Sequence, residues 1–125
     1  MVVRMRRDMD LVREILIACS KSPDGCVDAS VLADARHPFD VVAYHVDIMM
    51  EAGLIGGVVQ HDCGGGIALA QAGPLTWAGN EFLDAVASDS VWKQVKAKLG
   101  ETVKTTTIDV VKSLAVKLTQ QALGL

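Results

Sequence analysis

Histidine and cysteine come close together in one segment, where a single residue separates His61 from Cys63. Both side chains can bind a metal ion, and a Cys–His pair can supply a nucleophile and its base. A structural metal site needs more ligands at recognisable spacing, but there is no C-x-x-C or H-x-x-x-H pair, and the nearest further candidate is Cys26. Catalysis would also need a group that orients the base and an oxyanion site. We therefore expect no metal, no cofactor and no catalytic residue set, which means a protein that is not an enzyme.

Two further features could take part in binding. The glycines at 64–66 have the composition of a phosphate-binding loop, but they lack its glycine spacing and the Lys-Ser/Thr that follows it. They are better suited to supply positive φ angles at the tip of a hairpin. His45 lies beside the apolar stripe of a predicted helix, so it either forms hydrogen bonds within the fold or acts in pH sensing or ligand binding.

The distribution of charge is uneven. No lysine or arginine occurs between His37 and Trp92, and this stretch carries seven acidic residues. All twelve basic residues lie in the flanks, so the middle has a charge of -7, the flanks have +4, and the total is -3. DNA-binding proteins normally place Lys and Arg opposite the phosphates, so the charge of the middle segment argues against DNA binding there.

Composition indicates a globular protein, because half of the residues are apolar and 22% are charged. A chain of 125 residues suits one domain with appendages. Arg6 and Arg7 precede an apolar run, as in a signal peptide, but Asp8 and Asp10 interrupt it. No stretch reaches the roughly eighteen uncharged apolar residues that span a bilayer. With three cysteines and no export signal, we expect a cytoplasmic protein with reduced thiols and no membrane partner.

Periodicity and turn residues predict the elements of the first part. Apolar residues at helical spacing indicate a helix over residues 8–20, followed by a turn at 22–25, a very short strand at 26–28 and a short helix at 29–35. A third helix should begin with Asp40 as its N-cap, bury Val42, Val46 and Met49, and end at Gly53. Residues 54–60 and 67–72 should form a hairpin with a loose tip.

Helix, short strand, helix, helix and hairpin is the element order of a winged helix. The chain is therefore predicted to be α+β, mainly α, with a winged-helix-like core in residues 1–75 and a helical extension in 76–125. Thr76 should cap a fourth helix, a fifth should start at Asp89 or Ser90, and a last helix should follow Thr107. Trp77 and Trp92 lie at or near helix starts, where we expect both rings to seal the junction with the core.

The last helix has a heptad pattern, in which apolar residues alternate at spacings of three and four. This face could join two copies of the chain, or it could pack back on its own domain, and the pattern favours neither. The candidate oligomer interface consists of Ile108, Val111, Ala115, Leu118, Ala122 and Leu125.

Several motifs resemble a known family. They are residues 5–16 (MRRDMDLVREIL), 75–84 (LTWAGNEFLD) and 89–96 (DSVWKQVK), with Tyr44-His45 and 51–55 (EAGLI) between them. They look like the small uncharacterised proteins of bacteria and prophages that share a domain of unknown function. Many members carry Glu and His where this chain has Ala78 and Asn80. The resemblance implies a winged-helix-like core followed by helices in an intracellular, phage-derived protein, with no assigned activity.

Two functions remain as hypotheses. The first is a non-enzymatic module that acts through protein association, with self-association through the last helix and a partner-facing surface at Tyr44, Asp47 and Glu51. The alternative is a DNA-binding regulator that contacts phosphates from its basic flanks. The candidate phosphate contacts are Arg4, Arg6, Arg7, Lys93, Lys96 and Lys98.

Overall fold

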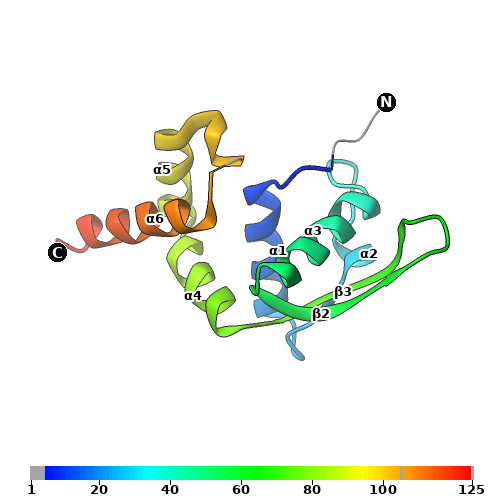
Figure 1. Ribbon diagram of the computed structural model, residues 1–125. Helices are drawn as coiled ribbons and strands as arrows, with labels where there is room; N and C mark the ends of the chain where they lie inside the picture. Colours follow the sequence, from blue (N-terminus) through cyan, green and yellow to red (C-terminus); the bar gives the residue numbers. More distant parts are fainter. Residues whose placement is uncertain (1–4, 105, 125) are drawn as a thin grey trace.

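The protein is described by a computed structural model, which covers residues 5–104 and 106–124. It is mainly helical with one small sheet, which confirms the predicted α+β class (Figure 1). The elements follow the predicted order. They are α1 Met9–Lys21, β1 Val27–Asp28, α2 Ala29–Leu32, α3 Phe39–Glu51, β2 Ile55–His61, β3 Ile67–Leu75, α4 Trp77–Val86, α5 Asp89–Leu99, the 3-10 helix η1 Gly100–Lys104 and α6 Ile108–Ala122.

The sheet is antiparallel with strand order β1-β3-β2. The central strand β3 pairs with β2 along most of its length, from Ile67 opposite His61 to Leu75 opposite Ile55. It pairs with β1 only at Gln71 and Ala72. The β2–β3 hairpin therefore extends past the rest of the sheet and projects from the body of the protein (Figure 1).

Side-chain caps explain where most helices begin. The side chains of Asp8, Thr76 and Ser88 each accept a hydrogen bond from a backbone N–H in the first turn of α1, α4 and α5, as predicted for Thr76. The predicted cap of α3 is wrong, because α3 begins one residue earlier than Asp40 and its N-cap is Pro38. Proline fixes its own backbone angle and suits such a boundary, so Asp40 lies in the first turn instead.

Helix α2 is shorter than predicted, since it ends at Leu32 rather than Ala35. Asp34 explains the early end. Its carboxylate accepts hydrogen bonds from the backbone N–H groups of Arg36 and His37, and its own N–H donates to the carbonyl oxygen of His37. This local turn competes with continuation of the helix.

A single hydrophobic core joins the two predicted parts of the chain, with α1 packed against both. Arg13 on α1 ties them together with polar bonds. Its Nε donates to the carbonyl oxygen of Val86 at 2.7 Å, and its Nη2 lies 2.7 Å from the carboxylate of Asp89. The pKa of Asp89 is lowered, chiefly by the hydrogen bond from Arg13. The boundary at residue 75 is therefore crossed by both apolar and polar contacts.

The heptad face of α6 packs within its own chain, which was one of the two alternatives. Val111, Ala115 and Leu118 are buried, and α6 contacts α4 and α5. Ile108 is partly buried, Ala122 is exposed and Leu125 lies outside the described residues. The three buried side chains have no surface left for a second copy, so they cannot serve as the interface predicted from the sequence while the domain is folded this way.

The two tryptophans differ in environment. Trp92 is 4% exposed, as predicted, and its ring lies 5.6 Å from the guanidinium of Arg13. The same prediction is wrong for Trp77, which is 82% exposed. Two residues later, Gly79 lies so close to the turn before β2 that an added Cβ would be 1.9 Å from the carbonyl oxygen of Leu54. It is therefore Gly79, and not the Trp77 ring, that lies at the junction with the core.

Candidate interaction surface

Helix α3 has one buried and one accessible face. Val42, Val46 and Met49 are at most 1% exposed and pack into the core, as predicted. The opposite side carries residues spaced by four, three and four positions, which places them along one side of a helix. These residues, called the α3 surface below, are Asp40, Tyr44, Asp47 and Glu51.

Hollows flank the α3 surface on two sides. One, of about 450 Å³, lies between α3 and the hairpin tip and is lined by Asp40, Asp47 and Asp62. The other, of about 480 Å³, lies between α3 and the starts of α1 and α6 and includes Glu51. Tyr44 lines both hollows. The three predicted partner-facing residues thus share a recessed acidic surface, and Tyr44 lies at its centre.

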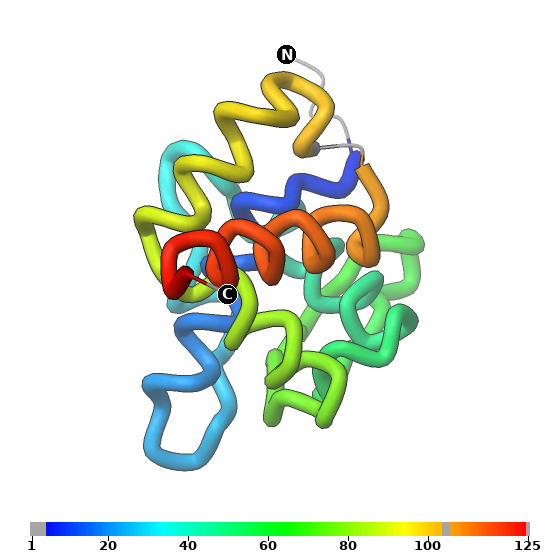
Figure 2. The backbone as a smooth tube through the Cα atoms, turned by 90° about the vertical axis from the view of Figure 1, so that its left-hand side faces the viewer, coloured from blue at the N-terminus to red at the C-terminus, as the bar shows by residue number. Residues whose placement is uncertain are grey.

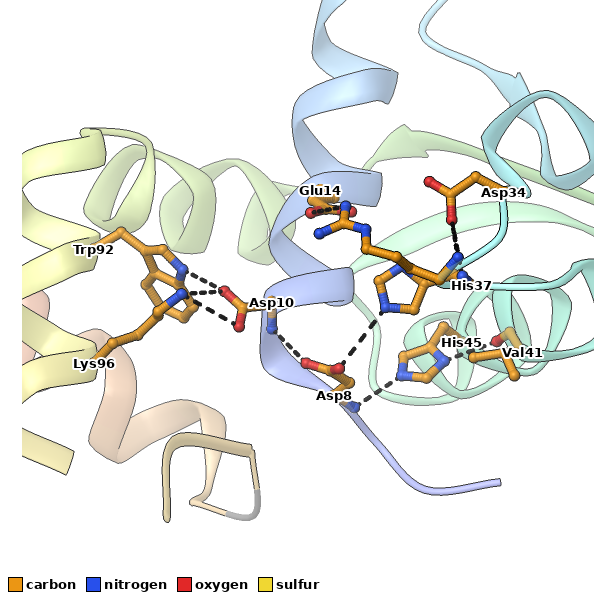
Figure 3. Close-up of polar contacts among 10 residues, drawn as sticks. Asp8, Asp10, Glu14, Asp34, His37, Val41, His45, Trp92 and Lys96 are labelled. Carbon is orange, nitrogen blue, oxygen red and sulfur yellow. Dashed lines mark hydrogen bonds and ion pairs between the residues drawn. The ribbon is translucent and has the colours of Figure 1, made fainter. Parts of the chain in front are cut away.

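A buried histidine fixes α3 against the start of α1 (Figure 3). The Nδ1 of His45 lies 2.8 Å from the carbonyl oxygen of Val41, and its Nε2 lies 2.8 Å from the backbone N of Asp8. A carbonyl only accepts and a backbone N–H only donates, so the ring must carry its proton on Nδ1 and accept at Nε2. Both bonds require neutral imidazole.

The environment of His45 favours the same neutral form. Burial lowers the pKa of His45 from its ordinary value of 6.5. The nearby Asp8 carboxylate opposes this shift, while His37 adds to it. Of the interpretations that the sequence left open, the structure places His45 in hydrogen bonds within the fold.

Asp10 links the same end of α1 to α5 (Figure 3). Its Oδ1 accepts a hydrogen bond from the indole Nε1 of Trp92 at 2.7 Å and lies 3.3 Å from Nζ of Lys96. Sequence reasoning missed Asp10 and Arg13 as anchors, because their partners are more than seventy residues away and no local pattern marks them. The only local signal was an acidic residue in the first turn of α1.

The candidate phosphate contacts are dispersed. Lys96 is held by Asp10, whereas Lys93 and Lys98 are exposed on α5, which lies on the opposite side of α1 from the hairpin in Figure 1. Arg6 is exposed, Arg7 donates to the carbonyl oxygen of Thr106, and Arg4 lies outside the described residues. Arg7 also lines the hollow beside α1.

The hairpin tip carries the residues that suggested metal or nucleophilic chemistry. Cys63 and His61 are exposed there, while Cys26 precedes β1, which pairs with β3 near Ala72 rather than at the tip. The strand pairing therefore does not place Cys26 beside His61 and Cys63. The carboxylate of Asp62 accepts from the N–H groups of Gly64 and Gly66, so it closes the turn. Within residues 5–104 and 106–124, no three His, Cys, Asp or Glu side chains are grouped so that they could hold a metal ion.

Trp77 lies near the end of α3, although sequence reasoning did not place it there. The preceding residue, Thr76, donates its hydroxyl hydrogen bond to the carbonyl oxygen of Gly53 and its N–H to that of Leu54. These carbonyls belong to the turn between α3 and β2. An exposed aromatic ring therefore begins α4 beside this turn. No helix in the described part of the chain is both long and apolar enough to cross a membrane.

The chain belongs to the family described as "Hypothetical protein (DUF2513)", whose model matches residues 6–107. It is also similar to an "Uncharacterized protein" of Haemophilus influenzae (strain ATCC 51907 / DSM 11121 / KW20 / Rd). The two are 30% identical over 122 residues, which cover 96% of this chain and 100% of that protein. The search of solved structures gave no match. The match confirms the resemblance to a family that shares a domain of unknown function.

Proposed function

We propose that this chain is a non-enzymatic winged-helix module that binds a protein partner through its α3 surface. The observation that carries the proposal is the charge of this surface. Asp40, Asp47 and Glu51 lie on the accessible side of the helix, and Asp62 faces the same hollow from the hairpin. In a winged helix, α3 and the hairpin are the elements that would face DNA, where like charges would repel the phosphates.

The partner that suits this surface is a protein segment with lysine or arginine side chains. Such cations would meet the carboxylates of Asp47 and Glu51, and opposite charge across an interface favours both encounter and specificity. Tyr44 adds an aromatic ring at the centre of the surface, and exposed Trp77 adds another beside its end. Aromatic residues supply much of the binding energy in many protein interfaces.

The shape of the surface supports the same choice. Hollows of about 450 and 480 Å³ on the two sides of Tyr44 could receive side chains of a partner. The second hollow has an apolar floor that includes Met9, Val12 and Met49. A basic segment with interspersed apolar residues would therefore find both charge and apolar contact on this surface.

The test is recovery of partners by tagged protein expressed in its own cells. The variant pair Asp47→Asn and Glu51→Gln removes two charges from the α3 surface and keeps similar side-chain shapes. The control pair Asp84→Asn and Glu101→Gln removes two exposed charges elsewhere. Proteins recovered by the wild type and the control, but lost with the α3 pair, support the proposal. Equal recovery by all three proteins would place the partner on another surface.

A further inference from the structure

The outer face of α6 remains accessible after its heptad face has packed inward. Val110 is 49% exposed and Val116 is 39% exposed, and Ser113 between them is exposed as well. In Figure 2, α6 crosses in front of the neighbouring helices and no other described segment lies over it. This face therefore leaves apolar side-chain surface uncovered beside charged residues. It is a different surface from the α3 surface and shares no residue with it.

Charged residues of α6 differ in whether they have an ionic partner among the described residues. Lys112, which faces α4, lies 3.3 Å from the carboxylate of Glu81. In contrast, within residues 5–104 and 106–124 neither Asp109 nor Lys117 forms an ion pair. Both are exposed and, with Ser113, they lie on one side of the helix, because they are spaced four positions apart.

These residues are arranged symmetrically about Ser113. Asp109 lies four positions before it and Lys117 four positions after it, while Val110 and Val116 lie three positions before and after. If two α6 helices pack antiparallel and cross at Ser113, Asp109 of each copy comes level with Lys117 of the other. Val110 of each copy likewise comes level with Val116 of the other. The face is therefore complementary to itself, as a two-fold symmetric contact requires.

The centre of the face allows close approach. Ser113 is small, and it lies in a hollow of about 380 Å³ that Asp109, Val110, Leu114 and Lys117 also line. Small residues at a crossing point let two helices come near enough for the flanking side chains to meet. The long aliphatic stem of Lys117 can cover Val110 of the other copy while its ammonium group reaches Asp109.

We infer that the outer face of α6 binds a second copy of this chain in a two-fold antiparallel contact centred on Ser113. The charge pattern selects this occupant. A partner with one sign of charge would meet one of the two ends of the face with like charge, whereas a second, antiparallel copy presents the opposite charge at both ends. Each dimer would contain two Asp109–Lys117 pairs.

The test is a charge-swap series followed by sedimentation velocity over a range of protein concentrations. Asp109→Lys alone places lysines opposite lysines at both ends, and Lys117→Asp alone places aspartates opposite aspartates. We expect each single variant to raise the dissociation constant of the dimer about tenfold or more, because two attractive pairs become repulsive. The double variant Asp109→Lys/Lys117→Asp restores opposite charges and should recover the dimer.

Circular dichroism of the same proteins keeps the result interpretable, since Asp109→Lys also removes an acidic residue from the first turn of α6. Folded single variants that dissociate, with recovery in the double variant, support the inference. It is overturned if the wild type is monomeric at the highest concentration, if the dimer persists in both single variants, or if the double variant is no better than the singles. The α3 variants Asp47→Asn and Glu51→Gln should leave the dimer unchanged, so failure of one proposal leaves the other standing.

Discussion

Because Trp77 and Trp92 differ in burial, we expect their substitution by alanine to change the free energy of unfolding by very different amounts. Trp92→Ala would remove a buried ring together with its hydrogen bond to Asp10, so we expect a loss of about 3 to 5 kcal/mol in the free energy of unfolding. Trp77→Ala alters a ring that is 82% exposed, so a change within about 0.5 kcal/mol is expected. Thermal melting followed by circular dichroism compares the two. Equal losses would show that Trp77 is also part of the core.

His45 should make stability depend on pH near neutrality. The pKa of His45 in the folded protein lies below the unfolded value of 6.5. At a pH between these two pKa values, the unfolded chain therefore binds more protons than the folded protein. The contribution of His45 to stability should be complete above about pH 6.5 and should decline as the pH falls through the folded pKa. In His45→Gln, the amide oxygen can still accept from Asp8 without titrating. Urea unfolding between pH 7.5 and 5.5 should therefore show a steeper fall for the wild type than for this variant, and equal slopes would contradict the assignment.

At the level of single residues, the sequence predicted roles that depend on local neighbours. Thr76 could be assigned as a cap because its partner, Gly79, lies three positions away. The shared side of Asp47 and Glu51 could likewise be predicted from helical spacing. The exposure of Trp77 could not, because the junction is occupied by a glycine whose close approach to Leu54 depends on the tertiary fold. A large apolar side chain near a helix start is compatible with either environment.

At the level of elements, the order and type of helices and strands were predictable, whereas the partner of α6 was not. Turn residues such as Pro23, Gly25 and Gly53 mark where elements end, and periodicity marks the buried side of each helix. A heptad pattern specifies only that one face is apolar. The apolar stripe of Val111, Ala115 and Leu118 is compatible with packing inside one chain and with packing between two chains, because either arrangement buries the same side chains.

Because α6 packs within its own chain, we expect acidic substitutions at two adjacent residues, Leu118 and Lys117, to affect folding differently. Leu118→Glu would place a carboxylate in a site that is 5% exposed, so we expect loss of folded structure rather than a folded monomer. Lys117→Asp also introduces an acid, but at an exposed position, and should keep its helicity. Far-ultraviolet circular dichroism and urea unfolding compare the two. A folded, monomeric Leu118→Glu protein would indicate that this stripe joins separate chains.

At the level of the whole molecule, the acidic residues of the α3 surface and the exposed lysines of α5 lie on different sides of the protein. Four of the seven acidic residues of the middle segment, Asp40, Asp47, Glu51 and Asp62, lie on α3 and the hairpin, whereas exposed lysines of α5 lie on the opposite side of α1. A duplex that approached the hairpin would meet carboxylates first. Of the candidate phosphate contacts, Arg7 lines the hollow that includes Glu51, whereas Lys93 and Lys98 lie on α5 on the opposite side of α1. A duplex on either side would therefore meet only some of these cations.

A mobility-shift series with duplex DNA at increasing salt tests this arrangement in the intact protein. We expect weak binding without sequence preference that disappears as salt rises, because a few dispersed cations release few counterions from the duplex. Asp47→Ala should leave this weak affinity unchanged or raise it, since the substitution removes a negative charge from the face that would approach the phosphates. Lys93→Ala with Lys98→Ala is the matched comparison, and it should lower any residual binding. A specific complex at physiological salt that is lost in Asp47→Ala would reverse the assignment, because a carboxylate of α3 would then be reading a cytosine edge and the acidic surface would be a DNA interface.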